Sequence, residues 1–230
     1  MSAKRIATVA YDFNRSPFVP LTGSAGDFIK VITGAAPPTA ACTAGYLTLA
    51  LTAASQAQNV CVYQADELPF LIADLVRVRW WAKCSAGLTG TSNISMGLCS
   101  ARNDDPDVPT ASAQFRLTGA NVVTVKSETA SLDTGLIATG LALTTTIKEF
   151  QIDFQAGLKT KSEAASVGGK ANVLFYMDND RGDLRRVGQA ATFDMSAYSS
   201  GLQVFFQIQK TSTDVGSLFV RRVEVDYRIN

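Results

Sequence analysis

Apolar and polar residues alternate with a period of two along several segments in the second half of the chain. In the last of them, Val223 and Val225 fall on one parity, and Arg222 and Glu224 fall on the other. Such alternation is typical of strands that bury one face. The clearest segments are residues 76–81, 94–99, 149–154, 202–209 and 222–229.

Weaker alternation predicts further strands at 113–117, 121–127, 172–177 and 190–195. No long segment shows the 3.6-residue period of a helix, although short helical turns are expected at residues 24–31 and 159–166. Many short strands joined by Gly, Asn, Asp and Thr turns are typical of antiparallel sandwiches. The sequence therefore predicts an all-β antiparallel β-sandwich of the jelly-roll type.

The N-terminal part of the chain has a different composition. Residues 1–65 carry six charged residues, residues 31–65 carry none, and the last of the seven prolines is Pro109. Proline removes a ladder donor, so a long proline-free region suits a continuous sheet. We therefore predict an extended N-terminal arm at 1–65 and the sandwich domain at 66–230.

The absence of histidine and the near-neutral net charge exclude several classes of function. The 230 residues contain no histidine, which excludes Ser-His-Asp and Cys-His nucleophile pairs and histidine-based metal sites. The formal net charge of +1 gives no electrostatic reason to expect a nucleic acid or an anionic membrane as a partner. We expect a protein that is not an enzyme and holds no cofactor.

The cysteines and the N-terminus bear on the compartment. Cys42, Cys61, Cys84 and Cys99 form no CxxC pair, so a zinc knuckle is not supported. Reduced, partly buried thiols are favoured over disulfides, which stay an alternative. The first residues lack the apolar core of a signal peptide, and no segment is long and apolar enough to span a membrane. Synthesis in the cytoplasm is therefore expected.

Two acidic loops are candidate calcium sites. One contains Asp104, Asp105 and Asp107, and the other is residues 178–183. The second has Asp183 at the position where an EF-hand needs glycine, and Asp is also an ordinary turn residue. We expect neither loop to hold a metal.

Paired carboxylates could support glycoside hydrolysis without histidine. The candidates are Glu149 with Asp153 and Glu224 with Asp226, each pair on one parity of a predicted strand. Because outward-facing residues on a strand are ordinarily solvated, this alternation explains both pairs without catalysis.

Trp81 shares its strand parity with Arg77 and Arg79. An indole beside guanidinium groups could stack on a sugar ring or contact a protein partner. The alternative is that the N-terminal region covers this face and that the arginines pair with nearby carboxylates.

Several segments together resemble structural proteins of tailed bacteriophages, in particular capsid decoration (cement) proteins and tail appendages with jelly rolls like those of lectins and carbohydrate-binding modules. The resemblance covers about residues 70–230 and carries no catalytic motif. The segments are VRVRWWAK at 76–83, MGLCSARND at 96–104, FQIDF at 150–154, LFYM at 174–177, ATFDMS at 191–196, LQVFFQIQK at 202–210 and VEVDY at 223–227.

The resemblance implies a virion structural protein on the capsid surface, made in the host cytoplasm, that binds the major capsid protein and its own copies as a trimer. An uncharged arm could lie extended across a neighbouring subunit. The candidate partner contacts are Phe13, Phe18, Pro37, Pro38, Arg77, Arg79 and Trp81.

The alternative function is a carbohydrate-binding module of a tail fibre or baseplate. That function predicts several exposed, coplanar aromatic side chains on one concave sheet. The sequence instead places Trp80 and Trp81 next to each other, and therefore on opposite faces of one strand. Capsid decoration is the preferred hypothesis from the sequence.

Overall fold

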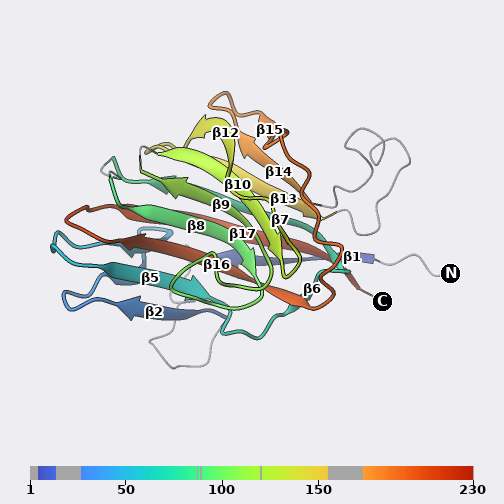
Figure 1. Cartoon of the computed structure of the whole chain (residues 1–230), viewed down its shortest axis with the longest axis horizontal. Helices are drawn as coiled ribbons and strands as arrows, with labels where there is room; N and C mark the ends of the chain where they lie inside the picture. Colours follow the sequence, from blue (N-terminus) through green and yellow to red (C-terminus); the bar gives the residue numbers. More distant parts are fainter. Residues whose placement is uncertain are drawn as a thin grey trace.

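The computed structural model describes residues 5–13, 27–86, 88, 90–119, 121–154 and 173–229. These residues form two antiparallel sheets packed face to face, which confirms the predicted all-β sandwich (Figure 1). Within the described ranges every regular element is a strand. No helix in them is long and apolar enough to cross a membrane.

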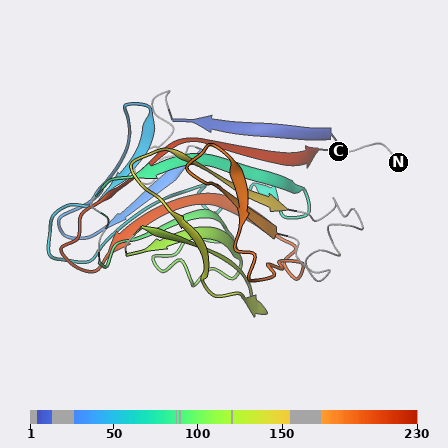
Figure 2. The same cartoon turned by 90° about the horizontal axis from the view of Figure 1, so that it is seen from above.

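The first sheet, called sheet A, has the strand order β15-β14-β13-β7-β17-β4-β3. β1 also belongs to it and pairs with β17. The two strands lie side by side along one layer in Figure 2. The bounds are β1 Arg5–Asp12, β3 Thr39–Thr43, β4 Tyr46–Ala50, β7 Leu75–Cys84, β13 Lys148–Phe154, β14 Val173–Asp178, β15 Leu184–Val187 and β17 Ser217–Ile229.

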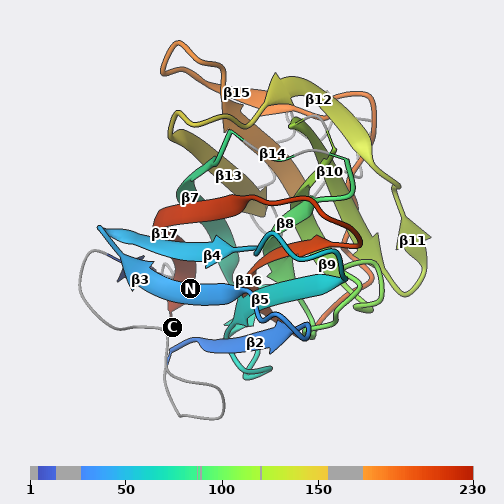
Figure 3. The same cartoon turned by 90° about the vertical axis from the view of Figure 1, so that its left-hand side faces the viewer.

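The second sheet, called sheet B, has the order β11-β10-β9-β8-β16-β5-β2, and β12 and β6 pair with β10 and β16. Figure 3 shows the two layers from one end, with β3 and β4 near β5 and β2. The bounds are β2 Ile29–Thr33, β5 Gln58–Tyr63, β6 Phe70–Leu71, β8 Asn93–Cys99, β9 Ser112–Thr118, β10 Val122–Thr129, β11 Leu132–Asp133, β12 Ile137–Ala142 and β16 Gly201–Lys210.

The core lies between the sheets and is built from one parity of each strand. Trp80 is fully buried, stacks on Phe150 with ring centroids 5.7 Å apart, and meets Phe115 and Phe206 edge-on. Its neighbour Trp81 points to the outer face of sheet A, as the alternation predicts. Aromatic rings in edge-on and stacked contact stabilise a core beyond their buried area alone.

The structure corrects the prediction of an extended N-terminal arm at residues 1–65. Its described residues contain five strands, β1 to β5, that belong to both sheets. β4 pairs with β17 and β5 pairs with β16, so both central strands depend on this part of the chain. The charge-poor composition has a simple cause, because strands that bury one face between two sheets need apolar side chains there. Residue 65 is therefore not a boundary between an arm and the sandwich.

Two local predictions also differ from the structure. Residues 190–195 are not a strand, although Phe193 and Met195 are buried as the alternation required. The helical turn expected at 24–31 is replaced at its C-terminal end by β2, whose residues pair with β5. The turn expected at 159–166 lies outside the described residues.

Candidate functional site

The outer face of sheet B is lined by polar side chains in register. Thr33, Asn59, Gln209 and Asn93 are direct cross-strand neighbours on β2, β5, β16 and β8. Residues directly opposite each other in a sheet point to the same face, so these four side chains form one row across four strands. A second row, two residues further along each strand, includes Gln207.

The segment between β8 and β9, residues 100–111 and here called the β8–β9 loop, lies over part of this face (Figure 1). The side-chain amide of Gln207 donates to the Asp104 carbonyl at 2.8 Å, and that of Gln114 donates to the Pro106 carbonyl at 3.0 Å. Both glutamines are buried beneath the loop. Buried amides need hydrogen-bond partners, and the loop backbone supplies them.

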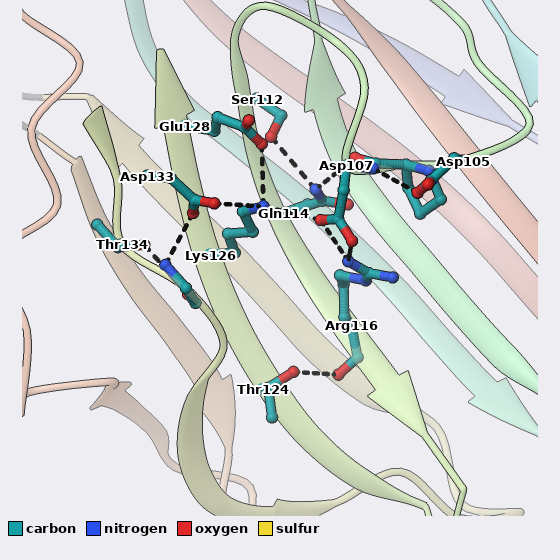
Figure 4. A network of polar contacts seen from close by, with 12 residues as sticks. Asp105, Asp107, Ser112, Gln114, Arg116, Thr124, Lys126, Glu128, Asp133 and Thr134 are labelled. Carbon is teal, nitrogen blue, oxygen red and sulfur yellow. Dashed lines mark hydrogen bonds and ion pairs between the residues drawn. The ribbon is translucent and has the colours of Figure 1, made fainter. Parts of the chain in front are cut away.

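One carboxylate of the loop holds it to the sheet. In Figure 4, Asp107 points from the loop toward Arg116 on β9 and Lys126 on β10. Arg116 Nη1 lies 2.5 Å from both carboxylate oxygens, and Lys126 Nζ lies 2.8 Å from Oδ1. The two cations are almost fully buried. Such charge-assisted contacts are the strong class of hydrogen bonds.

Two further acids complete the cluster. Lys126 Nζ lies 3.0 Å from Glu128 Oε2 and 3.2 Å from Asp133 Oδ2. Burial disfavours the charged forms, but the hydrogen bonds between Lys126, Arg116 and Asp107 outweigh it, so the pKa of Asp107 is lowered and that of Lys126 is raised. Asp107 and Lys126 are thus both charged at neutral pH, and their contact holds the loop to the sheet.

Beyond the loop, the sheet face opens into a groove of about 430 Å³. Its floor is the row Thr33, Asn59, Gln209 and Asn93, and Asp104 and Asp105 stand at its rim. The volume is in the range of sites that bind small ligands. The other lining residues are Ala57, Gln58, Thr91, Lys210 and Thr211.

Two floor amides keep unused hydrogen-bonding capacity. Asn93 makes no side-chain hydrogen bond to any described residue, and Gln209 uses only its oxygen, 3.5 Å from the Gln207 amide nitrogen. Asn59 is satisfied, because it donates to Asp104 at 2.8 Å and accepts from Gln207 at 3.1 Å. An amide both donates and accepts, which suits a hydroxyl-rich ligand.

The candidate contacts predicted in the N-terminal part do not gather at this groove. Phe13 is buried in the core against Phe28, with ring centroids 5.8 Å apart, and so is not a surface contact. Pro37 is exposed and Pro38 is buried in the connection between β2 and β3. Phe18 lies outside the described residues.

Arg77, Arg79 and Trp81 lie together on the outer face of sheet A, on the side of the molecule opposite the groove. Arg77 Nε donates to Asp153 at 3.0 Å, and Arg79 donates to Glu224 at 2.6 Å. The predicted pairing of these arginines with carboxylates is therefore confirmed. β1 extends this sheet beside β17 rather than covering its face, and Trp81 is half-buried.

The other acidic candidates are engaged in local contacts. Asp178 accepts from the backbone N–H groups of Asp180 and Gly182, and Asp180 pairs with the buried Lys148 at 2.6 Å. Across the described part of the chain, no cluster of three or more acidic or cysteine side chains is arranged to hold a metal. Of the carboxylates considered for hydrolysis, Asp226 accepts from Thr8 at 2.6 Å, Asp153 from Arg77 at 3.0 Å and Glu224 from Arg79 at 2.6 Å.

Sequence reasoning missed the groove. The available signal is the alternation of Gln203, Gln207 and Gln209 along β16, a parity that the pattern alone predicts to face solvent. Gln203 and Gln207 are instead buried, which is unusual for glutamine and marks a face that something covers.

Within the described residues, none of the four cysteines forms a disulfide. Burial raises the pKa of Cys61 to about 12 and that of Cys84 to about 11, and it also raises the pKa of Cys99. Cys42 is half-buried on β3.

We predict that the native protein reacts with an aromatic disulfide reagent at neutral pH mainly through Cys42, because only thiolates react and buried thiols stay protonated. The other three thiols should react only after denaturation. Mass spectrometry of the labelled peptides measures this, with the Cys42→Ser variant as the control. Rapid labelling of Cys84 in the folded protein would contradict the described packing.

Comparisons with known proteins identify the fold. No protein-family model matches the sequence, and no curated protein matches it. The laminarinase from Rhodothermus marinus is similar in structure, with a TM-score of 0.62, 10% identity and 100% of both chains covered. A protein of unknown function from Shewanella oneidensis MR-1 has a TM-score of 0.61 at 13% identity, with 99% of this chain and 88% of that chain covered. The exoplasmic/lumenal domain of VIP36, solved in a Ca²⁺/Man3GlcNAc-bound form, has a TM-score of 0.54 at 9% identity, with 87% of this chain and 84% of that chain covered. The chain therefore has the lectin-like jelly-roll fold.

Proposed function

We propose that this protein is a non-catalytic carbohydrate-binding domain and that its glycan lies in the groove on the outer face of sheet B. The main evidence for this proposal is the row of side chains along the floor of that groove, formed by Asn59, Gln209 and Asn93. Unused amide donors and acceptors on neighbouring strands match the vicinal hydroxyls of a sugar.

The charges at the groove favour a neutral glycan. Asp104 and Asp105 stand at the rim, and the one lining cation, Lys210, donates to the carbonyls of Thr52 and Ala54. An anionic sugar would meet like charge there without a free cation to balance it. The structural similarity to the glycan-bound VIP36 domain supports a binding role for this fold, although fold alone does not determine function.

The same residues argue against hydrolysis. Glycosidases need two carboxylates on opposite sides of the scissile bond. The carboxylates that line the groove are adjacent in one loop, and Asp104 is already engaged by Arg102 and Asn59.

We predict that the Asn93→Ala/Gln209→Ala double variant weakens binding of a neutral oligosaccharide by about tenfold or more, since each lost hydrogen bond is worth about 1 kcal/mol. A glycan array would identify the oligosaccharide, and calorimetry would measure the affinity. Gln189→Ala, which removes an exposed amide in a turn after β15, is the matched control.

Unchanged affinity in the double variant would place the glycan elsewhere. No binding to any neutral glycan would overturn the proposed function. Release of new reducing ends from the bound glycan would overturn its non-catalytic part.

Decoration of a phage capsid, as a trimer on the virion surface, stays a prediction from the sequence. It rests on the resemblance over residues 70–230, on the absence of histidine and of catalytic motifs, and on an uncharged arm. The described residues of the arm region are strands of the sandwich, so the argument from the arm no longer supports it. Saturable binding to emptied heads and light scattering on the free protein are the measurements that address it.

A further inference from the structure

The outer face of sheet A contains a second pocket, of about 410 Å³, on the side of the sandwich opposite the groove. Trp81 from β7 lines it together with Arg221, Arg222 and Glu224 from β17 and Asp12 from β1. It therefore combines an aromatic ring with both donors and acceptors, and none of these residues lines the groove on sheet B.

A β-bulge builds this pocket. Val220 pairs with Ala82 and Arg222 pairs with Trp81, so Arg221 is an extra residue in β17. Consecutive residues of a regular strand point to opposite faces, but here both arginines line the same pocket. Bulges commonly re-aim a side chain next to a functional site. The backbone N–H of Phe13, a core residue, donates to the Arg221 carbonyl at 3.2 Å and so holds the bulge.

The two arginines that line the pocket differ in their contacts with acids. Glu224 accepts from Arg79 at 2.6 Å and pairs with Arg222 at 2.8 Å, and Arg222 also lies 3.9 Å from Asp12. Arg221 is exposed, and its side chain contacts no acid among the described residues. Arg222 is thus held by acids, whereas the guanidinium of Arg221 has no acidic partner among the described residues.

We propose that this pocket binds a carboxylated sugar of the uronic-acid class. The planar guanidinium of Arg221 matches the geometry of a carboxylate and pairs with it through two parallel hydrogen bonds. The indole of Trp81 offers an apolar face to the C–H side of the sugar ring. Glu224 and Asp12 supply acceptors for the hydroxyls of the sugar ring. An acidic peptide has a carboxylate but no such ring hydroxyls, so it would leave these acceptors unused. This site is independent of the neutral-glycan groove on sheet B.

Intrinsic fluorescence tests the proposal, because Trp81 lies in the pocket and Trp80, the only other tryptophan, is in the core. Titration with an oligogalacturonide should change the emission of the intact protein and leave that of Trp81→Phe unchanged. Arg221→Ala should weaken the affinity at least about tenfold. Arg181→Ala, an exposed arginine in the turn after β14, is the matched control and should bind normally.

Further ligands and variants separate this site from the other one. The Asn93→Ala/Gln209→Ala variant should bind the oligogalacturonide normally, because neither residue lines the pocket on sheet A. Failure of the neutral-glycan proposal and failure of this proposal can therefore be told apart. Binding of the corresponding neutral oligosaccharide with equal affinity would overturn the proposal. Acetate that binds as tightly as the sugar acid would also overturn it, because the ring would then contribute nothing. Unchanged affinity in Arg221→Ala would exclude the bulge arginine as the carboxylate ligand.

Discussion

A chain that begins at residue 66 is expected not to fold. It lacks β4 and β5, the neighbours of the central strands β17 and β16. Among the side chains it removes from the core are Leu47, Leu49, Val60 and Val62, each 0% exposed. Burying a Leu or Val stabilises a protein by about 1.5–3 kcal/mol, so these four contribute about 6–12 kcal/mol. That is comparable to the whole stability of a typical domain, about 5–15 kcal/mol.

The matched comparison is a chain that begins at residue 27. It keeps β2 to β5 and loses β1, which pairs with β17 alone among the described strands. We expect this chain to fold with a lowered melting temperature, because Phe28 loses its contacts with Tyr11 and Phe13. Far-ultraviolet circular dichroism and thermal melting compare the two chains. A cooperative melt with a strand spectrum for residues 66–230 would restore the boundary predicted from the sequence.

The fold class was predictable because period-two alternation reports burial directly. Trp80 and Trp81 were assigned to opposite faces of one strand from adjacency alone, and the structure confirms that assignment. The same signal exists in β4, where Leu47 and Leu49 alternate with Tyr46 and Thr48. In that region the absence of charge and the nearby prolines predict an extended arm instead. Composition describes what a segment contains, whereas periodicity describes which side of it is buried.

The candidate sites depend on contacts that local patterns do not contain. Gln207 has the parity of an exposed residue, and it is buried only because the β8–β9 loop lies over it. The bulge on β17 did leave a trace, since the apolar positions Val220 and Val223 are three residues apart instead of two. That interruption shows where the alternation shifts, but it does not show that Trp81 stands opposite.

Replacing Asp107 by alanine should destabilise the protein and release the β8–β9 loop. Arg116 then keeps its charge, is 6% exposed, and loses its only acidic partner among the described residues. Removing one partner of a buried ion pair costs about 3–5 kcal/mol. Asp107 itself is partly exposed, which places the expected loss at about 3 kcal/mol, the lower end of that range. Asp105→Ala, in the same loop and exposed, should cost under about 1 kcal/mol.

The stability difference between the native protein and Asp107→Ala should depend on pH in one direction. The pKa of Asp107 is lower in the folded protein than in the unfolded chain, so its contribution is complete above the unfolded value of about 4. As the pH falls through the lower folded value, the carboxylate is protonated and the contribution is lost. Denaturant unfolding of both proteins between neutral pH and pH 3 measures this. A difference that grows on acidification would contradict the described ion pairs.

Two buried thiols distinguish opening of the loop from unfolding of the whole protein. Cys61 lies on the outer face of sheet B, where Arg102 of the loop contacts it, whereas Cys84 lies in the core between the sheets. In Asp107→Ala we expect Cys61 to react faster with thiol reagents in the absence of denaturant, because its cover has moved. Cys84 should react at the slow rate set by global unfolding. Equal acceleration of both thiols would mean that the ion pairs stabilise the sandwich as a whole rather than hold the loop against its sheet.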